Sequence, residues 1–223
     1  MLIPEDPAII TPPIRHAILS GRFEADEADA VPEIVRPGDV VLEIGGGIGF
    51  ISTLLAREPA VRRVISVEAN PDLIDYMAAL HATNNVSVTR INAVLTNEPV
   101  ASANFFLRRD FWMSSLMPGP NPFVATVEVP ARNLDILLWA EGVTLVVCDI
   151  EGAEAFLFDG ADLSGVDRIF IELHDHVTGL KGVQSVFRSL GDHGFAYDPR
   201  HSRGSVVLFQ RVQDDEVLRP YAG

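Results

Sequence analysis

The chain of 223 residues is long enough for one well-cored domain and too short for two of ordinary size. Its composition, 48% hydrophobic and 22% charged, is typical of a folded globular protein and excludes a long disordered tract. The 31 acidic side chains outnumber the 17 basic ones, and the formal net charge of −14 predicts a small-molecule partner, no nucleic acid and no membrane.

The first 13 residues hold acidic side chains and prolines where a signal peptide has a basic stretch followed by an apolar one. No apolar run reaches the ~20 residues that span a bilayer. The single cysteine, Cys148, excludes an intrachain disulfide, and the apolar run around it predicts a buried thiol. We therefore expect a cytoplasmic protein.

We expect residues 1–38 to form an N-terminal segment of one or two short helices that packs on the core, because Ile14, Ala17 and Ile18 make an apolar stripe at helical spacing. From residue 39 to residue 213, short β-branched runs alternate with helical periodicity, which is typical of a parallel sheet covered by helices on both faces. The predicted strands are residues 40–44, 64–68, 87–92, 143–149, 168–173, 195–197 and 205–210. Seven such strands make a doubly wound, mostly parallel sheet, and residues 214–223 remain as a C-terminal tail.

Two crossover helices follow the first two predicted strands. Ile51, Leu54 and Leu55 have helical spacing in the first, and the second begins with Asn70 as N-cap and Pro71 in its first turn. Residues 101–130 break the alternation, because two predicted strands, 103–108 and 125–129, flank a stretch rich in glycine and proline. We expect this stretch to form a hairpin insertion over the edge of the sheet.

A glycine-rich run, E-I-G-G-G-I-G-F at residues 43–50, connects the first strand to the first crossover helix. Gly45, Gly47 and Gly49 let the backbone pass close to a ligand. In a dinucleotide fingerprint a third small residue would stand where this chain has Phe50. Glu43 would repel a phosphate but suits the cationic amino group and sulfonium of S-adenosylmethionine. The run resembles the first motif of class I methyltransferases and predicts this cofactor.

The ends of the next two strands extend the predicted cofactor site. Glu68 comes 19 residues after Gly49, where an acid accepts the ribose hydroxyls in doubly wound nucleotide sites. Asn92 and Ala93 end the third strand, where the adenine edge would lie, although a loop asparagine also serves to stabilise turns. Ala69 and Asn70 complete the set.

Further motifs resemble the FkbM family of methyltransferases over about residues 21–210. They are C-D-I-E-G-A-E at 148–154, I-E-L-H at 171–174, N-L-D-I-L-L at 133–138, G-R-F-E at 21–24 and S-S-L at 114–116. The resemblance implies a Rossmann-like class I fold and methyl transfer to a hydroxyl of a sugar, polyketide or other secondary metabolite. Members often carry lysine where this chain has Val147, so any role of that lysine is absent here or filled elsewhere.

Asp149, Glu151 and His174 follow adjacent central strands, at the edge where ligands bind in open α/β sheets. We expect Asp149 beside the methionine moiety and the transferring methyl, and His174 or Glu151 as the base or the residue that orients the substrate. Histidine suits proton removal at neutral pH, and His176 is a rival for this role. Trp112, Ser114 and Ser115 are predicted to contact the acceptor, although this segment could equally pack on the core.

Three alternatives stay open. A divalent metal could be held by a set of five side chains, Asp149, Glu151, His174, Asp175 and His176, but their spacing does not require a metal site, and we expect none. An NAD(P)-dependent oxidoreductase would share the fold and the ribose acid. Val147 also leaves room for a non-catalytic partner protein that only binds S-adenosylmethionine. The sequence shows no sustained heptad, and a homodimer is a working expectation.

Overall fold

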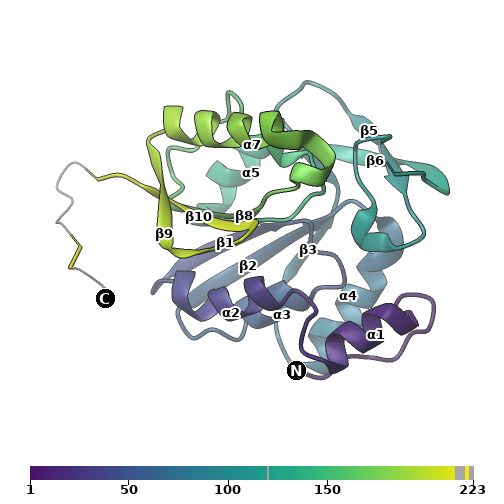
Figure 1. Cartoon of the computed structure of the whole chain (residues 1–223). Helices are drawn as coiled ribbons and strands as arrows, with labels where there is room; N and C mark the ends of the chain where they lie inside the picture. Colours follow the sequence, from purple (N-terminus) through teal and green to yellow (C-terminus); the bar gives the residue numbers. More distant parts are fainter. Residues whose placement is uncertain (120, 214–218, 221–223) are drawn as a thin grey trace.

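The computed structural model describes residues 1–119, 121–213 and 219–220. Pro120 of the predicted insertion and nearly all of the predicted tail lie outside the described residues. The chain folds into three layers, a sheet with helices on both faces (Figure 1). None of the described helices is long and apolar enough to cross a membrane.

All seven predicted strands lie in one sheet, ordered β3-β2-β1-β7-β8-β10-β9. The five strands from β3 to β8 in this order are parallel. Beyond β8, β10 pairs antiparallel with both β8 and β9. The strands are β1 (Asp39–Ile44), β2 (Val61–Glu68), β3 (Thr89–Asn92), β7 (Leu145–Cys148), β8 (Arg168–Glu172), β9 (Phe195–Arg203) and β10 (Val206–Arg211). The prediction of a doubly wound, mostly parallel sheet is confirmed.

Alternation along β1 divides the core into two clusters, because successive side chains of a strand point to opposite faces. Val40, Leu42 and Ile44 pack with the helices α5 (Leu134–Glu141), α6 (Glu154–Leu157) and α7 (Asp175–Asp192). Val41 packs with α2 (Ala25–Ile34) and α3 (Phe50–Leu55) on the other face. Figure 1 shows α5 and α7 above the sheet and α2, α3 and α4 (Pro71–Thr83) below it.

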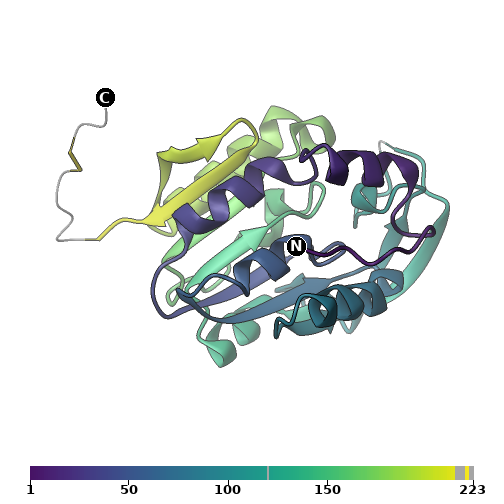
Figure 2. The same cartoon turned by 90° about the horizontal axis from the view of Figure 1, so that it is seen from below.

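The N-terminal segment crosses the lower face of the molecule (Figure 2). It contains α1 (Pro12–Leu19) and α2, and its apolar residues Ile3, Ile10 and Ile18 pack on Leu73 and Leu80 of α4. The side chain of Asn70 accepts a hydrogen bond from the Asp72 backbone N–H, which confirms Asn70 as the N-cap of α4.

The insertion is a three-stranded sheet, where the sequence predicted a two-stranded hairpin. Strands β5 (Ser102–Leu107) and β6 (Ala125–Asn133) pair antiparallel as expected, but β4 (Val94–Thr96) adds to β6 in parallel. A three-residue strand is too short to show an alternating pattern, so β4 has no recognisable signal in the sequence. Between β5 and β6, a short 3₁₀ helix, η1 (Phe111–Met113), turns toward the main sheet's edge.

Candidate active site

The carboxyl ends of the parallel strands meet at one edge of the sheet and enclose a cavity of about 790 Å³, partly open to solvent. Nine of the residues predicted from the sequence line it: Gly45, Gly47, Glu68, Ala69, Ala93, Trp112, Ser114, Asp149 and Glu151. The other six, Glu43, Gly49, Asn70, Asn92, Ser115 and His174, are not among the lining residues.

The glycine loop after β1 passes directly against the end of β7. Gly45 has a φ of 89°, and a Cβ there would lie 1.7 Å from the carbonyl oxygen of Asp149. Any side chain would therefore displace the loop or the strand end. Gly49 has a different role, since it begins α3 and a Cβ there would lie 2.9 Å from the His81 Nε2 atom.

Glu68 presents its carboxylate to the cavity from the end of β2, with only 6% of the residue exposed. Its Oε1 accepts a hydrogen bond from the Asn70 backbone N–H at 2.6 Å, and its Oε2 accepts one from the Gly47 N–H at 2.7 Å. Burial raises the pKa of Glu68 to about 7 in spite of these bonds. The Asn70 backbone N–H therefore fixes the carboxylate of Glu68, the acid predicted to bind the ribose.

Asn92 does not take the predicted place at an adenine edge. Its Nδ2 donates to the backbone carbonyls of Glu68 and Ala69 at 2.9 and 3.0 Å, so both amide hydrogens stabilise the turn after β2. The neighbouring Ala93 lines the cavity instead.

Glu43, which the sequence predicted to meet the cofactor's cation, does not line the cofactor cavity but lines a smaller cavity next to it. It is buried on the lower face of β1, where it accepts a hydrogen bond from the Ser66 hydroxyl. Burial raises the pKa of Glu43 to about 8, while bonds from Ser66 and Ser52 act in the opposite direction. The carboxyl group therefore supports the strands behind the glycine loop.

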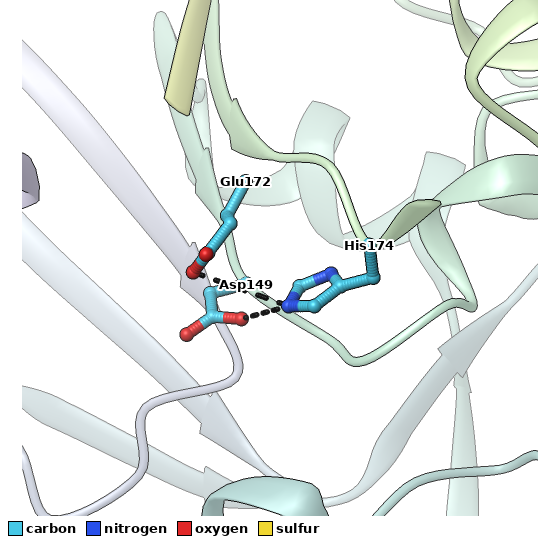
Figure 3. Close-up of side chains that lie close together, drawn as sticks. All are labelled: Asp149, Glu172 and His174. Atoms are coloured by element: carbon cyan, nitrogen blue, oxygen red, sulfur yellow. Dashed lines mark ion pairs between the residues drawn. The ribbon is translucent and has the colours of Figure 1, made fainter. Parts of the chain in front are cut away.

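His174, predicted as the base or the residue that orients the substrate, lies buried between two carboxylates. Only 4% of its side chain is exposed, and its Nε2 lies 3.3 Å from the Asp149 Oδ1 (Figure 3). Its Nδ1 lies 3.2 Å from the Glu154 Oε1. Burial alone would lower the pKa of His174, but hydrogen bonds and charges from Asp149 and Glu154 raise it to about 11. An imidazolium at neutral pH cannot accept the acceptor's proton.

Glu151 and Asp149 are the two predicted catalytic residues that line the cavity. Glu151 has a φ of 42°, a left-handed conformation that is strained for a residue with a side chain and is often found at functional sites. Burial raises the pKa of Glu151, and the nearby His174 and His176 partly offset this. His176 is exposed and pairs with Glu151, its Nε2 lying 3.5 Å from the carboxylate.

The insertion contributes one wall of the cavity. Trp112 is 40% exposed and lines the cavity with the buried Ser114, whose hydroxyl accepts a hydrogen bond from the Arg108 backbone N–H. Ser115, predicted to contact the acceptor, does not line the cavity, and the reason is local. Its hydroxyl accepts the Met117 N–H, and its backbone pairs with Phe106, so it is turned into the insertion.

Sequence reasoning assigned no role to Glu24, which the structure places in the cavity. Glu24 begins α2 with a φ of 46°, and burial with the charge of Asp149 raises its pKa well above the ordinary value. Its carboxylate Oε1 lies 4.0 Å from the position that a Cβ on Gly47 would take. The only signal for it was its place in the G-R-F-E segment.

Comparison with known proteins gives one family match. Residues 14–107, from α1 through the glycine loop to β5, match the model of the TRM5/TYW2 methyltransferase domain. No curated protein matches the sequence. The match supports S-adenosylmethionine as the cofactor and methyl transfer as the reaction class, and the FkbM family is not among the matches.

Solved structures agree on the fold. A Streptococcus pneumoniae protein, Sp1610, described as a candidate tRNA (m1A22) methyltransferase and bound to S-adenosyl-L-methionine, has a TM-score of 0.50 at 11% identity, over 85% of this chain and 74% of that one. A Pyrococcus furiosus methyltransferase has a TM-score of 0.48 at 15% identity (94% and 88% covered), and M. jannaschii TYW2 with AdoMet has 0.45 at 15% (84% and 75%). The predicted Rossmann-like class I methyltransferase fold is confirmed.

Proposed function

We propose that this protein is an S-adenosylmethionine-dependent methyltransferase that methylates a hydroxyl oxygen of a small molecule, such as a sugar or a polyketide. The observation that carries the proposal is the charge of the cavity. Four carboxylates line it, those of Glu24, Glu68, Asp149 and Glu151, and no lysine or arginine does so among the described residues. In their ionised forms these groups attract the cofactor's sulfonium and ammonium groups and repel phosphates. Burial raises the pKa values of Glu24, Glu68 and Glu151, and a bound cation would lower them again.

The cavity has suitable partners for each part of the cofactor. Glu68 can accept hydrogen bonds from both ribose hydroxyls, because its two oxygens are already fixed by backbone donors. Leu73, Val94 and Leu95 provide an apolar wall for the adenine ring. Asp149 and Glu24 supply negative charge for the methionine end. When bound, S-adenosylmethionine supplies a methyl group on a positively charged sulfur atom.

The residues of the chain then have two tasks, to align the acceptor and to remove its proton. In the transfer the acceptor oxygen would bond to the methyl carbon as the carbon–sulfur bond breaks, and the electron pair of that bond would stay on sulfur. The hydroxyl proton passes to Glu151, whose carboxylate is a stronger base because burial raises its pKa. The imidazolium of His174 holds the Asp149 carboxylate in place from behind, 3.3 Å away.

Two other substrate classes compete with this proposal. The Streptococcus pneumoniae protein with this fold is described as acting on tRNA. The four carboxylates around the cavity argue against RNA here, because its phosphates would be repelled. The same charges disfavour an NAD(P)-dependent oxidoreductase, whose pyrophosphate needs donors or cations, and Phe50 stands where that fingerprint has a small residue.

Radiolabelled S-adenosylmethionine tests the proposal when offered with hydroxyl-bearing small molecules and, separately, with total tRNA. We expect label in a small molecule, and Glu151→Gln should lower kcat by roughly 10²–10⁴-fold, the range of general-base catalysis. The variant should keep its affinity for S-adenosylhomocysteine, and the exposed Glu98→Gln is the matched control. Label in tRNA alone, or binding of NADPH in place of S-adenosylhomocysteine, would refute the proposal. Cofactor binding without turnover on any acceptor would favour a non-catalytic binding protein.

A further inference from the structure

Three ligand-type side chains converge behind the cofactor cavity. Asp149 follows β7. Glu172 is the last residue of β8, the parallel neighbour of β7, and His174 comes two residues later. One oxygen from each carboxylate and one imidazole nitrogen all lie within 4.8 Å of one another. The His174 Nε2 lies 3.3 Å from the Asp149 carboxylate and 3.9 Å from that of Glu172 (Figure 3).

These separations suit one shared ion. Two ligands that each lie about 2.1 Å from a metal are separated by roughly 3.0–4.2 Å, depending on the angle between them. Small side-chain rotations are therefore enough to bring the three atoms to bonding distance. Sequence reasoning did not include Glu172 among possible ligands, because only the pairing of β7 with β8 brings it beside Asp149.

The His174 Nδ1, the ring nitrogen that does not face Asp149 and Glu172, has a carboxylate partner, as metal-binding histidines typically do. The Glu154 Oε1 lies 3.2 Å from the His174 Nδ1 and accepts the His174 backbone N–H at 3.0 Å. Its other oxygen accepts the Gly152 N–H at 2.7 Å, and Glu154 is only 2% exposed. A carboxylate held this firmly fixes the ring so that Nε2 points at Asp149 and Glu172, and such partners raise the basicity of the ligating nitrogen.

The surroundings are rich in acidic side chains. A smaller cavity next to the cofactor cavity is lined by the carboxyl groups of Glu24, Glu27, Glu43, Asp149 and Glu172. Among the described residues that line it there is no lysine, arginine or histidine. A cation beside this cavity would lower the repulsion between these groups.

We propose that Asp149, Glu172 and His174 bind a divalent transition-metal ion such as Mn²⁺ or Zn²⁺, which takes the place of the proton that the His174 Nε2 carries without the ion. A nitrogen ligand beside two carboxylates favours these ions over Mg²⁺ and Ca²⁺, which prefer oxygen ligands. Because Asp149 lines both cavities, the ion would border the space for the acceptor. Its catalytic role rests on the proposed function: a metal ion there would lower the pKa of the acceptor hydroxyl.

Metal binding is tested without any acceptor, by titrating chelator-treated protein with Mn²⁺ and measuring free Mn²⁺ by electron paramagnetic resonance. We expect one site in the wild type, loss of at least tenfold in affinity in Glu172→Gln and His174→Gln, and a loss of roughly 10–100-fold in Glu154→Gln. Asp175→Asn is the matched control, since this exposed acid follows His174 directly and lies outside the ligand set. Its affinity should equal that of the wild type.

Several results would overturn the metal site. They are the absence of saturable Mn²⁺ binding, unchanged affinity in Glu172→Gln and His174→Gln, equal loss in Asp175→Asn, and Mg²⁺ binding as tight as Mn²⁺ binding. Binding of S-adenosylhomocysteine, measured calorimetrically on each variant, shows that the fold and the cofactor site remain intact. It also separates the two proposals, because metal binding can fail while cofactor binding persists, and the reverse.

Discussion

The affinity for S-adenosylhomocysteine should rise with pH in a way that Glu68 controls. Burial raises the pKa of Glu68 to about 7, so its carboxyl group is mostly neutral at pH 6 and mostly ionised at pH 8. With a pKa of about 7, the ionised fraction rises from about one tenth to about nine tenths between these pH values. If only the carboxylate accepts both ribose hydroxyls, the apparent affinity scales with this fraction and rises by roughly tenfold.

Isothermal titration calorimetry at pH 6, 7 and 8 measures this rise in the wild type and in Glu68→Gln. The amide keeps the shape of the side chain but puts an NH₂ against one of the two backbone donors, those of Gly47 and Asn70. Losing a hydrogen bond to a charged group costs about 1.5–3 kcal/mol, so at pH 8 the variant should bind roughly 10–100-fold more weakly. Its affinity should also lose the tenfold pH dependence. A flat wild-type profile, or a variant that keeps the slope while Glu98→Gln matches the wild type, would refute this reasoning.

Two further predictions concern stability. Arg168→Ala should lower the free energy of unfolding in urea by about 3–5 kcal/mol, because it leaves Asp39 buried without the guanidinium that lies 2.6 Å away. Arg63→Ala is the comparison: Arg63 pairs with Glu141 nearer the surface, and its loss should cost no more than about 1 kcal/mol. The melting temperature should fall as the pH rises from 5 to 9. The folded pKa of His174, about 11, lies above its ordinary value, so its stabilisation is complete below about pH 6.5 and is lost as the pH rises. Glu43 and Glu172, with pKa values raised to about 8, act in the same direction, because the folded state keeps protons that the unfolded chain releases above about pH 4.5. A melting temperature that rises from pH 5 to 9 would contradict these raised pKa values.

The sequence was sufficient for the main sheet because each strand is an unbroken apolar or alternating run bounded by turn residues. It was also sufficient for the glycine loop, where the tight approach of Gly45 to Asp149 leaves no space for a side chain. Tertiary contacts decided the rest. Glu24 reaches the cavity from a helix start 21 residues before Gly45, and Glu172 meets Asp149 only through strand pairing. The protonation of His174 depends on Glu154, which sequence reasoning treated only as part of a motif.

Glu43 and Glu68 show why a strand-end acid cannot be assigned from its spacing alone. The register places Glu43 opposite Ser66, two residues before Glu68 on β2. At about 3.3 Å per residue, Glu68 lies roughly 6–7 Å closer to the carboxyl edge of the sheet. Glu68 therefore lines the cofactor cavity, whereas Glu43 lies farther from the carboxyl edge and accepts a hydrogen bond from the Ser66 hydroxyl.

This difference in depth gives opposite expectations for the same substitution. Because its pKa is raised to about 8, Glu43 is already mostly neutral at pH 7, and Glu43→Gln replaces a neutral carboxyl group with a neutral amide of the same shape. We expect the affinity for S-adenosylhomocysteine at pH 7 to stay within about threefold of the wild type, a change below 1 kcal/mol. Calorimetry on Glu43→Gln beside Glu68→Gln measures the contrast. A loss as large in Glu43→Gln as in Glu68→Gln would mean that Glu43 contacts the cofactor after all, as its place before the glycine loop first indicated.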